Sequence, residues 1–85
     1  MTQEEIIKTV NSFLVQEFEV EESKISPEAN LRTTLDLDSL DYVDLVVVIE
    51  SNFGFKVKGE DFLEIHTFQD FYNYCHAKVQ EKETV

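Results

Sequence analysis

The first eighteen residues carry apolar side chains at helical spacing. Four of them lie three or four positions apart, which places them on one face of a helix: Ile6, Val10, Phe13 and Leu14. Thr2 and Glu5 have the three-residue spacing of a capping box, in which side chains and backbone amides bond reciprocally at a helix start. These patterns predict a helix from about Gln3 to Phe18.

The stretch from Glu21 to Leu37 shows no sustained period. Pro27 interrupts any helix, and four further residues are of types common in turns and caps: Ser26, Asn30, Thr33 and Thr34. A loop of more than ~12–15 residues is unusual in a small domain and is often functional. We predict a long loop that four apolar side chains attach to the core: Ile25, Ala29, Leu31 and Leu35.

The segment from Asp38 to Phe53 combines a clear start signal with an ambiguous interior. Asp38 is a good N-cap residue, and Asp41 stands where the second residue of a capping box belongs. The β-branched residues from Val46 to Ile49 favour a strand by propensity. The pattern nevertheless favours a helix, because a strand would have to bury Asp44 or alternate apolar residues on both faces. Gly54 then fits the helix end.

The last third of the chain predicts shorter elements and a closing helix. Residues 55–58 alternate in polarity and are compatible with a short strand, and residues 60–65 with one or two helical turns. Thr67, with Asp70 behind it, is predicted to cap a final helix that turns its apolar side chains inward: Phe68, Phe71, Tyr72, Cys75 and Val79. Residues 81–85 are expected to form a frayed tail.

These elements predict one all-α domain over residues 1–85. The expected architecture is a small four-helix bundle of three longer helices and a short third helix, with the long loop between helices one and two. The chain has 85 residues, which leaves no room for a second core.

The second predicted helix also presents apolar residues away from the core. On a helical wheel Leu40 and Val47 lie opposite the core-facing stripe, with Val43 at the edge. No Lys or Arg occurs from Thr33 to Phe55. Isolated exposed apolar residues are common, but an apolar spot with a polar rim is also typical of docking surfaces. We predict a docking surface for a basic partner with a shallow apolar pocket, formed by Leu40, Asp41, Val43, Asp44, Val47 and Glu50.

Charge and composition narrow the classes of partner. Eighteen acidic against seven basic residues give a net charge of −11, which argues against nucleic acid or an anionic membrane surface as partner. The longest apolar stretch, Leu45 to Ile49, is too short to insert into a membrane, and residues 1–5 do not resemble a signal peptide. Cys75 is the only cysteine, so no intramolecular disulfide is possible and a cytoplasmic location is expected. We also expect a monomer.

Ser39 lies in the first turn of the second predicted helix. A phosphate on its hydroxyl would lie near unpaired backbone N–H groups and the positive end of the helix dipole. The carboxylates of Asp38 and Asp41 would repel it. Taken by itself, a serine between these residues fits a phosphorylation site or a simple helix cap.

The residues around Ser39 resemble a known motif. Asp38-Ser39-Leu40-Asp41, followed by Val43, Asp44, Leu45 and Glu50, is similar to the phosphopantetheine attachment motif of acyl carrier proteins, and the similarity in length, charge and layout extends over nearly the whole chain. The resemblance implies a carrier without catalytic residues. Its acyl cargo would be held as a thioester on 4′-phosphopantetheine, joined to Ser39 by a phosphopantetheinyl transferase that recognises Asp38.

The resemblance further implies a role in fatty-acid or polyketide-like biosynthesis. The partners would be acyl-transfer and elongation enzymes, and the cargo pocket would be lined by Val46, Ile49, Phe53, Val57, Phe62 and Ile65. Three features depart from the family pattern. Thr34-Leu35-Asp36 replaces the usual Asp-Leu-Gly, Lys56 and Lys58 add positive charge, and the bulk of Phe62 would shorten the pocket. These departures point toward a specialised pathway.

Other readings of the sequence fit less well. An EF-hand starting at Asp36 fails, because Asp41 replaces the required Gly and Val47 the required Glu, so no metal site is predicted. Neither His66 nor His76 has a nucleophile at a supporting spacing, so no catalytic residue is predicted. An unmodified acidic interaction module remains an alternative, as does a carrier of aminoacyl or peptidyl groups.

Overall fold

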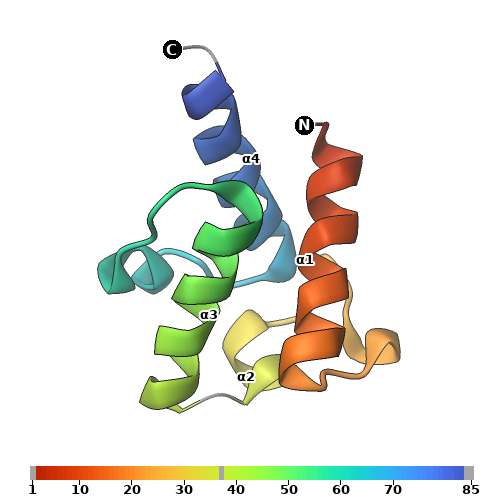
Figure 1. Ribbon diagram of the computed structural model, residues 1–85. Coiled ribbons are helices and arrows are strands. Elements are labelled where there is room, and N and C mark those ends of the chain that lie inside the picture. Colours follow the sequence, from red (N-terminus) through yellow and green to blue (C-terminus); the bar gives the residue numbers. More distant parts are fainter. Residues whose placement is uncertain (1, 37, 84–85) are drawn as a thin grey trace.

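The computed structural model describes residues 2–36 and 38–83, and this part of the chain is all helical (Figure 1). The elements are α1 (Gln3–Phe18), η1 (Glu22–Lys24), α2 (Leu31–Leu35), α3 (Ser39–Phe53), η2 (Gly59–Leu63) and α4 (Phe68–Glu83), where η1 and η2 are 3₁₀ helices. α1 and α4 pack against each other, and Figure 1 shows α3 and η2 on one side of them. The predicted all-α bundle is confirmed.

Side chains cap the three long helices as the sequence predicts. At α1, the Glu5 amide donates to Thr2 Oγ1 at 3.2 Å and the Thr2 amide donates to Glu5 Oε1 at 2.9 Å. At α4, the Asp70 amide donates to Thr67 Oγ1 at 3.1 Å. Gly54 ends α3 with φ +78°, a left-handed conformation that glycine adopts without steric cost.

The segment between α1 and α3 is more regular than predicted. Instead of one continuous loop, it contains η1 and the five-residue helix α2. The Asn30 side chain caps α2 by accepting a hydrogen bond from the Thr33 amide at 2.9 Å, and Leu31 and Leu35 are buried. A helix of little more than one turn is too short to show a period, so only its cap was visible in the sequence.

Two further expectations about local structure need correction. Residues 55–58 form no strand, and the only bridge within the described residues joins Asn30 and Thr67. α4 continues to Glu83, three residues into the predicted frayed tail, while residues 84–85 lie outside the described part. Burial of Val79 and an ion pair between Lys78 and Glu81 at 3.9 Å support this last part of the helix.

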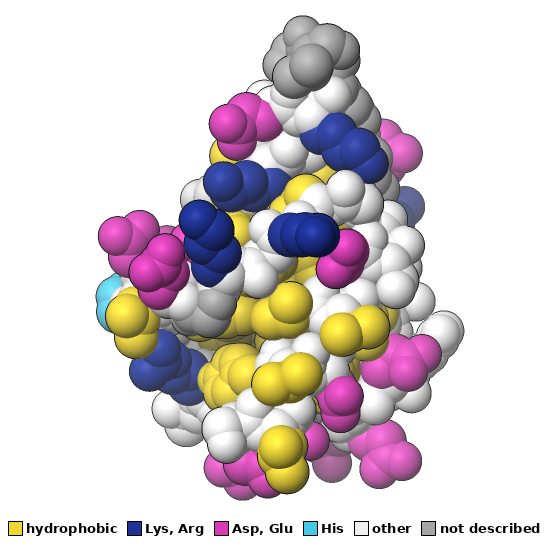
Figure 2. Space-filling model, turned by 60° about the vertical axis from the view of Figure 1, so that its left-hand side comes forward, with side chains coloured by type: hydrophobic (Ala, Val, Ile, Leu, Met, Phe, Trp, Pro, Cys, Tyr) yellow, Lys and Arg dark blue, Asp and Glu magenta, His cyan; other side chains and the backbone are white. Residues whose placement is uncertain are grey.

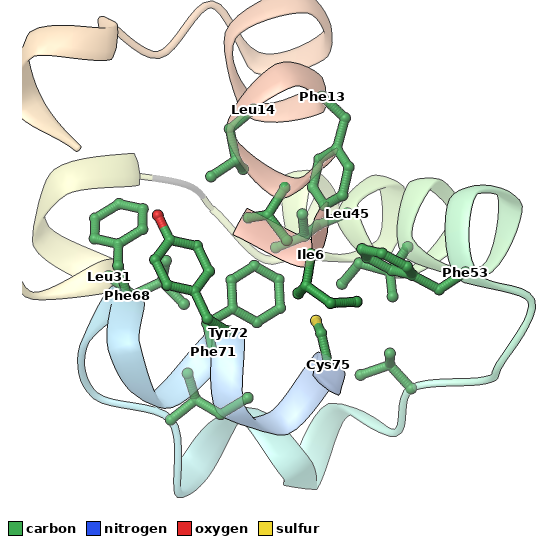
Figure 3. Close-up of a cluster of buried hydrophobic side chains, with 14 of the residues drawn as sticks. Ile6, Phe13, Leu14, Leu31, Leu45, Phe53, Phe68, Phe71, Tyr72 and Cys75 are labelled. Atoms are coloured by element: carbon green, nitrogen blue, oxygen red, sulfur yellow. The ribbon is translucent and has the colours of Figure 1, made fainter. Parts of the chain in front are cut away.

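The core draws side chains from every long helix. Figure 3 shows Ile6 of α1 among Leu45 of α3 and Phe71 and Tyr72 of α4, all of them fully or nearly fully buried. The Tyr72 hydroxyl donates to Asn11 Oδ1 at 2.6 Å, so its one polar atom remains satisfied. No helix in the described part is long and apolar enough to cross a membrane.

Asp36 adopts an unusual backbone conformation just before α3. Its φ of +49° is left-handed, and its amide caps α2 by donating to the Arg32 carbonyl at 2.9 Å. This conformation is sterically unfavourable for alanine, whereas Asp and Gly tolerate it. We therefore expect Asp36→Ala to lower the free energy of unfolding by about 1 kcal/mol. Urea denaturation would measure this, with Asp36→Gly as a charge-matched control. Equal stability of the two variants would contradict the conformational argument.

Candidate functional site

Ser39 is the first residue of α3 and is exposed. Its position follows from a capping box formed by the two aspartates on either side of it. The Asp41 amide donates to Asp38 Oδ1 at 2.9 Å, and the Asp38 amide donates to Asp41 Oδ2 at 3.4 Å. Within the described residues, no hydrogen bond engages the Ser39 hydroxyl. The capping box thus fixes the backbone on both sides of Ser39, and its side chain is exposed.

The capping box limits what the helix end offers to a phosphate. The amide of Asp41, at the third helical position, already donates a hydrogen bond to the Asp38 side chain. A phosphate on Ser39 would therefore find only the N–H groups of the first two positions. Three carboxylates, those of Asp36, Asp38 and Asp41, are close to it in the chain. The start of α3 is therefore less favourable for a phosphate than unpaired amides and the helix dipole alone would make it.

The outward face of α3 carries the apolar spot that the wheel predicts. Leu40 is 75% exposed, Val43 60% and Val47 57%, and Asp44 and Glu50 are also exposed. Asp41, by contrast, is half-buried, and its carboxylate is part of the capping box. Figure 2 shows hydrophobic side chains gathered on this side of the molecule, with acidic side chains at the margins and most of the Lys and Arg above. The exposure of these residues is confirmed, and their role in docking stays a prediction.

An open groove of about 770 Å³ lies beside Ser39. Its lining residues are Arg32, Asp36, Ser39, Tyr42, Val43, Val46, Val47, Val57 and Phe62. Among the predicted cargo-pocket residues, Val46, Val57 and Phe62 line this groove. The other three, Ile49, Phe53 and Ile65, are buried in the core and do not border it.

Three contacts fix the wall of the groove that η2 provides. Phe62 is 5% exposed, and its ring lies 5.5 Å from that of Tyr42, measured between centroids. Arg32 Nη2 donates to the Phe62 carbonyl at 3.1 Å. The Tyr74 hydroxyl donates to Asp61 Oδ2 at 2.7 Å, which lowers the pKa of Asp61. η2 is thus attached to α2, α3 and α4 together.

The sequence reasoning missed three groove residues as site residues: Arg32, Asp36 and Tyr42. Arg32 was not singled out, and Asp36 was considered only as a departure from the family pattern. The available signal was that Arg32 is the only arginine in the chain and lies seven residues before Ser39. Because α2 was predicted as a loop, the directions of its side chains could not be predicted.

The histidines form no catalytic arrangement in the described part. His66 is exposed and contributes backbone groups, its amide donating to Asp70 Oδ2 at 3.2 Å. The His76 ring is 3.3 Å from the side-chain amide nitrogen of Gln80. Among the residues that the structure describes, no cluster of His, Cys, Asp and Glu could hold a metal ion.

The Cys75 thiol is fully buried, and this burial raises its pKa to about 12. Thiolate is the reactive form, so the folded chain should show almost no reaction with a thiol reagent at pH 8. We expect an Ellman-type assay to find no fast thiol in the unmodified protein and one after phosphopantetheine attachment. The counts should rise to one and two on unfolding. A fast thiol in the folded, unmodified chain would contradict this.

Comparison with known proteins places this geometry in context. Residues 8–75 match the family described as "Phosphopantetheine attachment site". The acyl carrier protein of Thermotoga maritima is 41% identical over 78 residues, which cover 92% of this chain and 96% of that protein. "Acyl carrier protein 2" of Ralstonia nicotianae is 36% identical over 70 residues, 82% of this chain and 86% of that protein. The acyl carrier protein of Thermosynechococcus vestitus is 33% identical over 79 residues, 93% of this chain and 98% of that protein.

Proposed function

The chain belongs to the acyl carrier protein family, and from this premise we propose that it carries acyl intermediates on Ser39. The prosthetic group of the family is covalently attached 4′-phosphopantetheine. The observation that carries the assignment to Ser39 is its place: an exposed hydroxyl, without a hydrogen bond to any described residue, at the start of a capped helix and beside an open groove. A transferase can reach this hydroxyl without unfolding any element.

The residues around Ser39 fit such a group. The hydroxyl would hold the phosphate through a phosphodiester bond, and the adjoining groove offers apolar walls from Val43, Val46 and Val57. The arm, once attached, supplies a thiol that forms the thioester. The chain itself contributes attachment, shielding by the groove and a surface for recognition. The chemistry of acyl transfer would come from separate enzymes.

We further propose that the exposed face of α3 is where those enzymes dock. Leu40 and Val47 form the apolar centre, and Asp44 and Glu50 supply the acidic surroundings. A basic partner surface would be attracted to this face over a long range, which speeds encounter. The cargo would be an acyl intermediate of fatty-acid or polyketide-like biosynthesis.

Attachment is tested directly by incubating the chain with coenzyme A and a broad-specificity phosphopantetheinyl transferase. We expect intact mass to rise by one phosphopantetheine, and fragmentation to place the added mass on Ser39. A folded chain that gains no mass would overturn the carrier assignment in favour of an unmodified acidic interaction module. A gain at another residue would overturn the site alone.

A further inference from the structure

Arg32 occupies an unusual electrostatic position in a strongly acidic chain. The sequence has eighteen carboxylate side chains, yet within the described residues none lies within 4 Å of the Arg32 guanidinium. The guanidinium instead donates to the backbone carbonyl of Phe62 at 3.1 Å. Arginine has five N–H donors, so this bond leaves most of them unused.

The side chain is directed to the same groove as the attachment serine. Arg32 and Ser39 both line it, and among the described lining residues Arg32 is the only Lys or Arg. Arg32 belongs to the short helix α2, and its guanidinium donates a hydrogen bond to η2. Both restrict where the guanidinium can lie. Arg32 is exposed, and its guanidinium has unused donors and lies in a groove whose other charged lining residue, among those described, is Asp36. This arrangement can receive an anion.

Tyr42 provides a second donor on this side of the groove. Its ring packs on Phe62, and among described residues its hydroxyl has no hydrogen-bond partner. Burial raises the Tyr42 pKa, and the charge of Arg32 partly offsets that rise. Arg32 and Tyr42 both contact Phe62 and line the same groove, and the raised pKa keeps the Tyr42 hydroxyl protonated as a donor at neutral pH.

The phosphate expected on Ser39 has few other positive neighbours. Asp36, Asp38 and Asp41 all repel it, and the capping box already takes one of the helix-end amides. A guanidinium binds phosphate or carboxylate oxygens through two parallel hydrogen bonds, which makes it the strongest available donor in the groove.

We propose that Arg32, together with the Tyr42 hydroxyl, forms an oxyanion-binding subsite in the groove beside Ser39. The subsite deepens the proposed carrier function and rests on it. The oxyanion comes from one of two sources: the phosphodiester on Ser39, or a carboxylate at the far end of the acyl cargo. In both cases the subsite holds the arm against the groove, and in the second case it also selects acyl groups that end in a carboxylate.

The single arginine makes the subsite directly observable. A ¹⁵N-labelled chain gives one arginine Nε–Hε signal, which can be followed in four forms: unmodified, with the free arm, with an octanoyl arm, and with an eight-carbon acyl group that ends in a carboxylate. A shift on attachment of the free arm, retained in both acyl forms, identifies the phosphodiester. A shift confined to the carboxylate-ended form identifies the cargo.

A second measurement tests whether the contact stabilises the fold. The arm used is the one that shifts the arginine signal. We expect its attachment to raise the melting temperature of the native chain by about 4 °C more than it raises the melting temperature of the Arg32→Gln chain. Lys8→Gln removes the same charge from an exposed position on α1 and should behave as the native chain. Intact mass confirms the state of every sample.

These outcomes separate the two proposals. If no arm is attached to Ser39, the carrier function and the subsite both fail. If the arm is attached but the arginine signal is the same in all four forms, only the subsite is overturned. Equal melting-temperature gains for Arg32→Gln and Lys8→Gln would likewise count against the subsite while leaving the carrier intact.

Discussion

Replacing Ser39 with alanine is expected to abolish phosphopantetheine attachment and to leave the fold unchanged. The loss should be complete, because a methyl group offers no oxygen for the phosphodiester bond. The fold should persist because the Ser39 side chain is exposed and makes no hydrogen bond within the described residues. Alanine is also the best helix former, so stability should be equal or higher by a few tenths of a kcal/mol.

The matched control is Ser51→Ala, which removes another exposed serine of the same helix. This variant should gain one phosphopantetheine as the native chain does. Circular dichroism and intact mass together distinguish a lost site from a lost fold. Attachment to the Ser39→Ala chain would reject the assignment, and failure of the Ser51→Ala chain would show that the assay reports something other than the site.

The sequence predicted the long helices well because their signals are local. Helical spacing and the Thr2–Glu5 pair gave the bounds of α1, and the Asp38–Asp41 pair gave the start of α3. In α3, period and capping outweighed the β-branched run of valines. Gly54 fixed its end, since a left-handed residue there is most easily a glycine. Each of these signals lies within a few residues of the feature it predicts.

The groove could not be predicted in the same way, because it depends on how distant segments meet. Ile49 and Phe53 were expected to line it, but they lie on the side of α3 that packs into the core. Tyr42 was not expected in the site, yet it is half-buried and borders the groove. Arg32 enters the site only because α2 folds and η2 supplies the carbonyl of Phe62.

Reversing the charge of Asp44 and Glu50 together is expected to slow productive encounters with partner enzymes about 10-fold at low salt. Both side chains are exposed beside the apolar centre of α3, and Asp44→Lys with Glu50→Lys raises the net charge by four units there. Opposite charges steer encounter over roughly a Debye length, so the effect should shrink as salt rises. The kcat/KM of a ketosynthase or a transferase, measured from 20 to 500 mM salt, would show both.

The control for this double variant must change charge without changing the proposed face. Glu4 and Glu22 are exposed on α1 and η1, outside α3 and outside the lining of the groove beside Ser39, and their reversal to lysine also adds four charges. If steering depends only on net charge, the two double variants will slow the enzymes equally. If the face of α3 is the docking surface, Asp44 and Glu50 will dominate. Unchanged kinetics for the Asp44 and Glu50 variant would therefore reject the docking surface, even with Ser39 loaded normally.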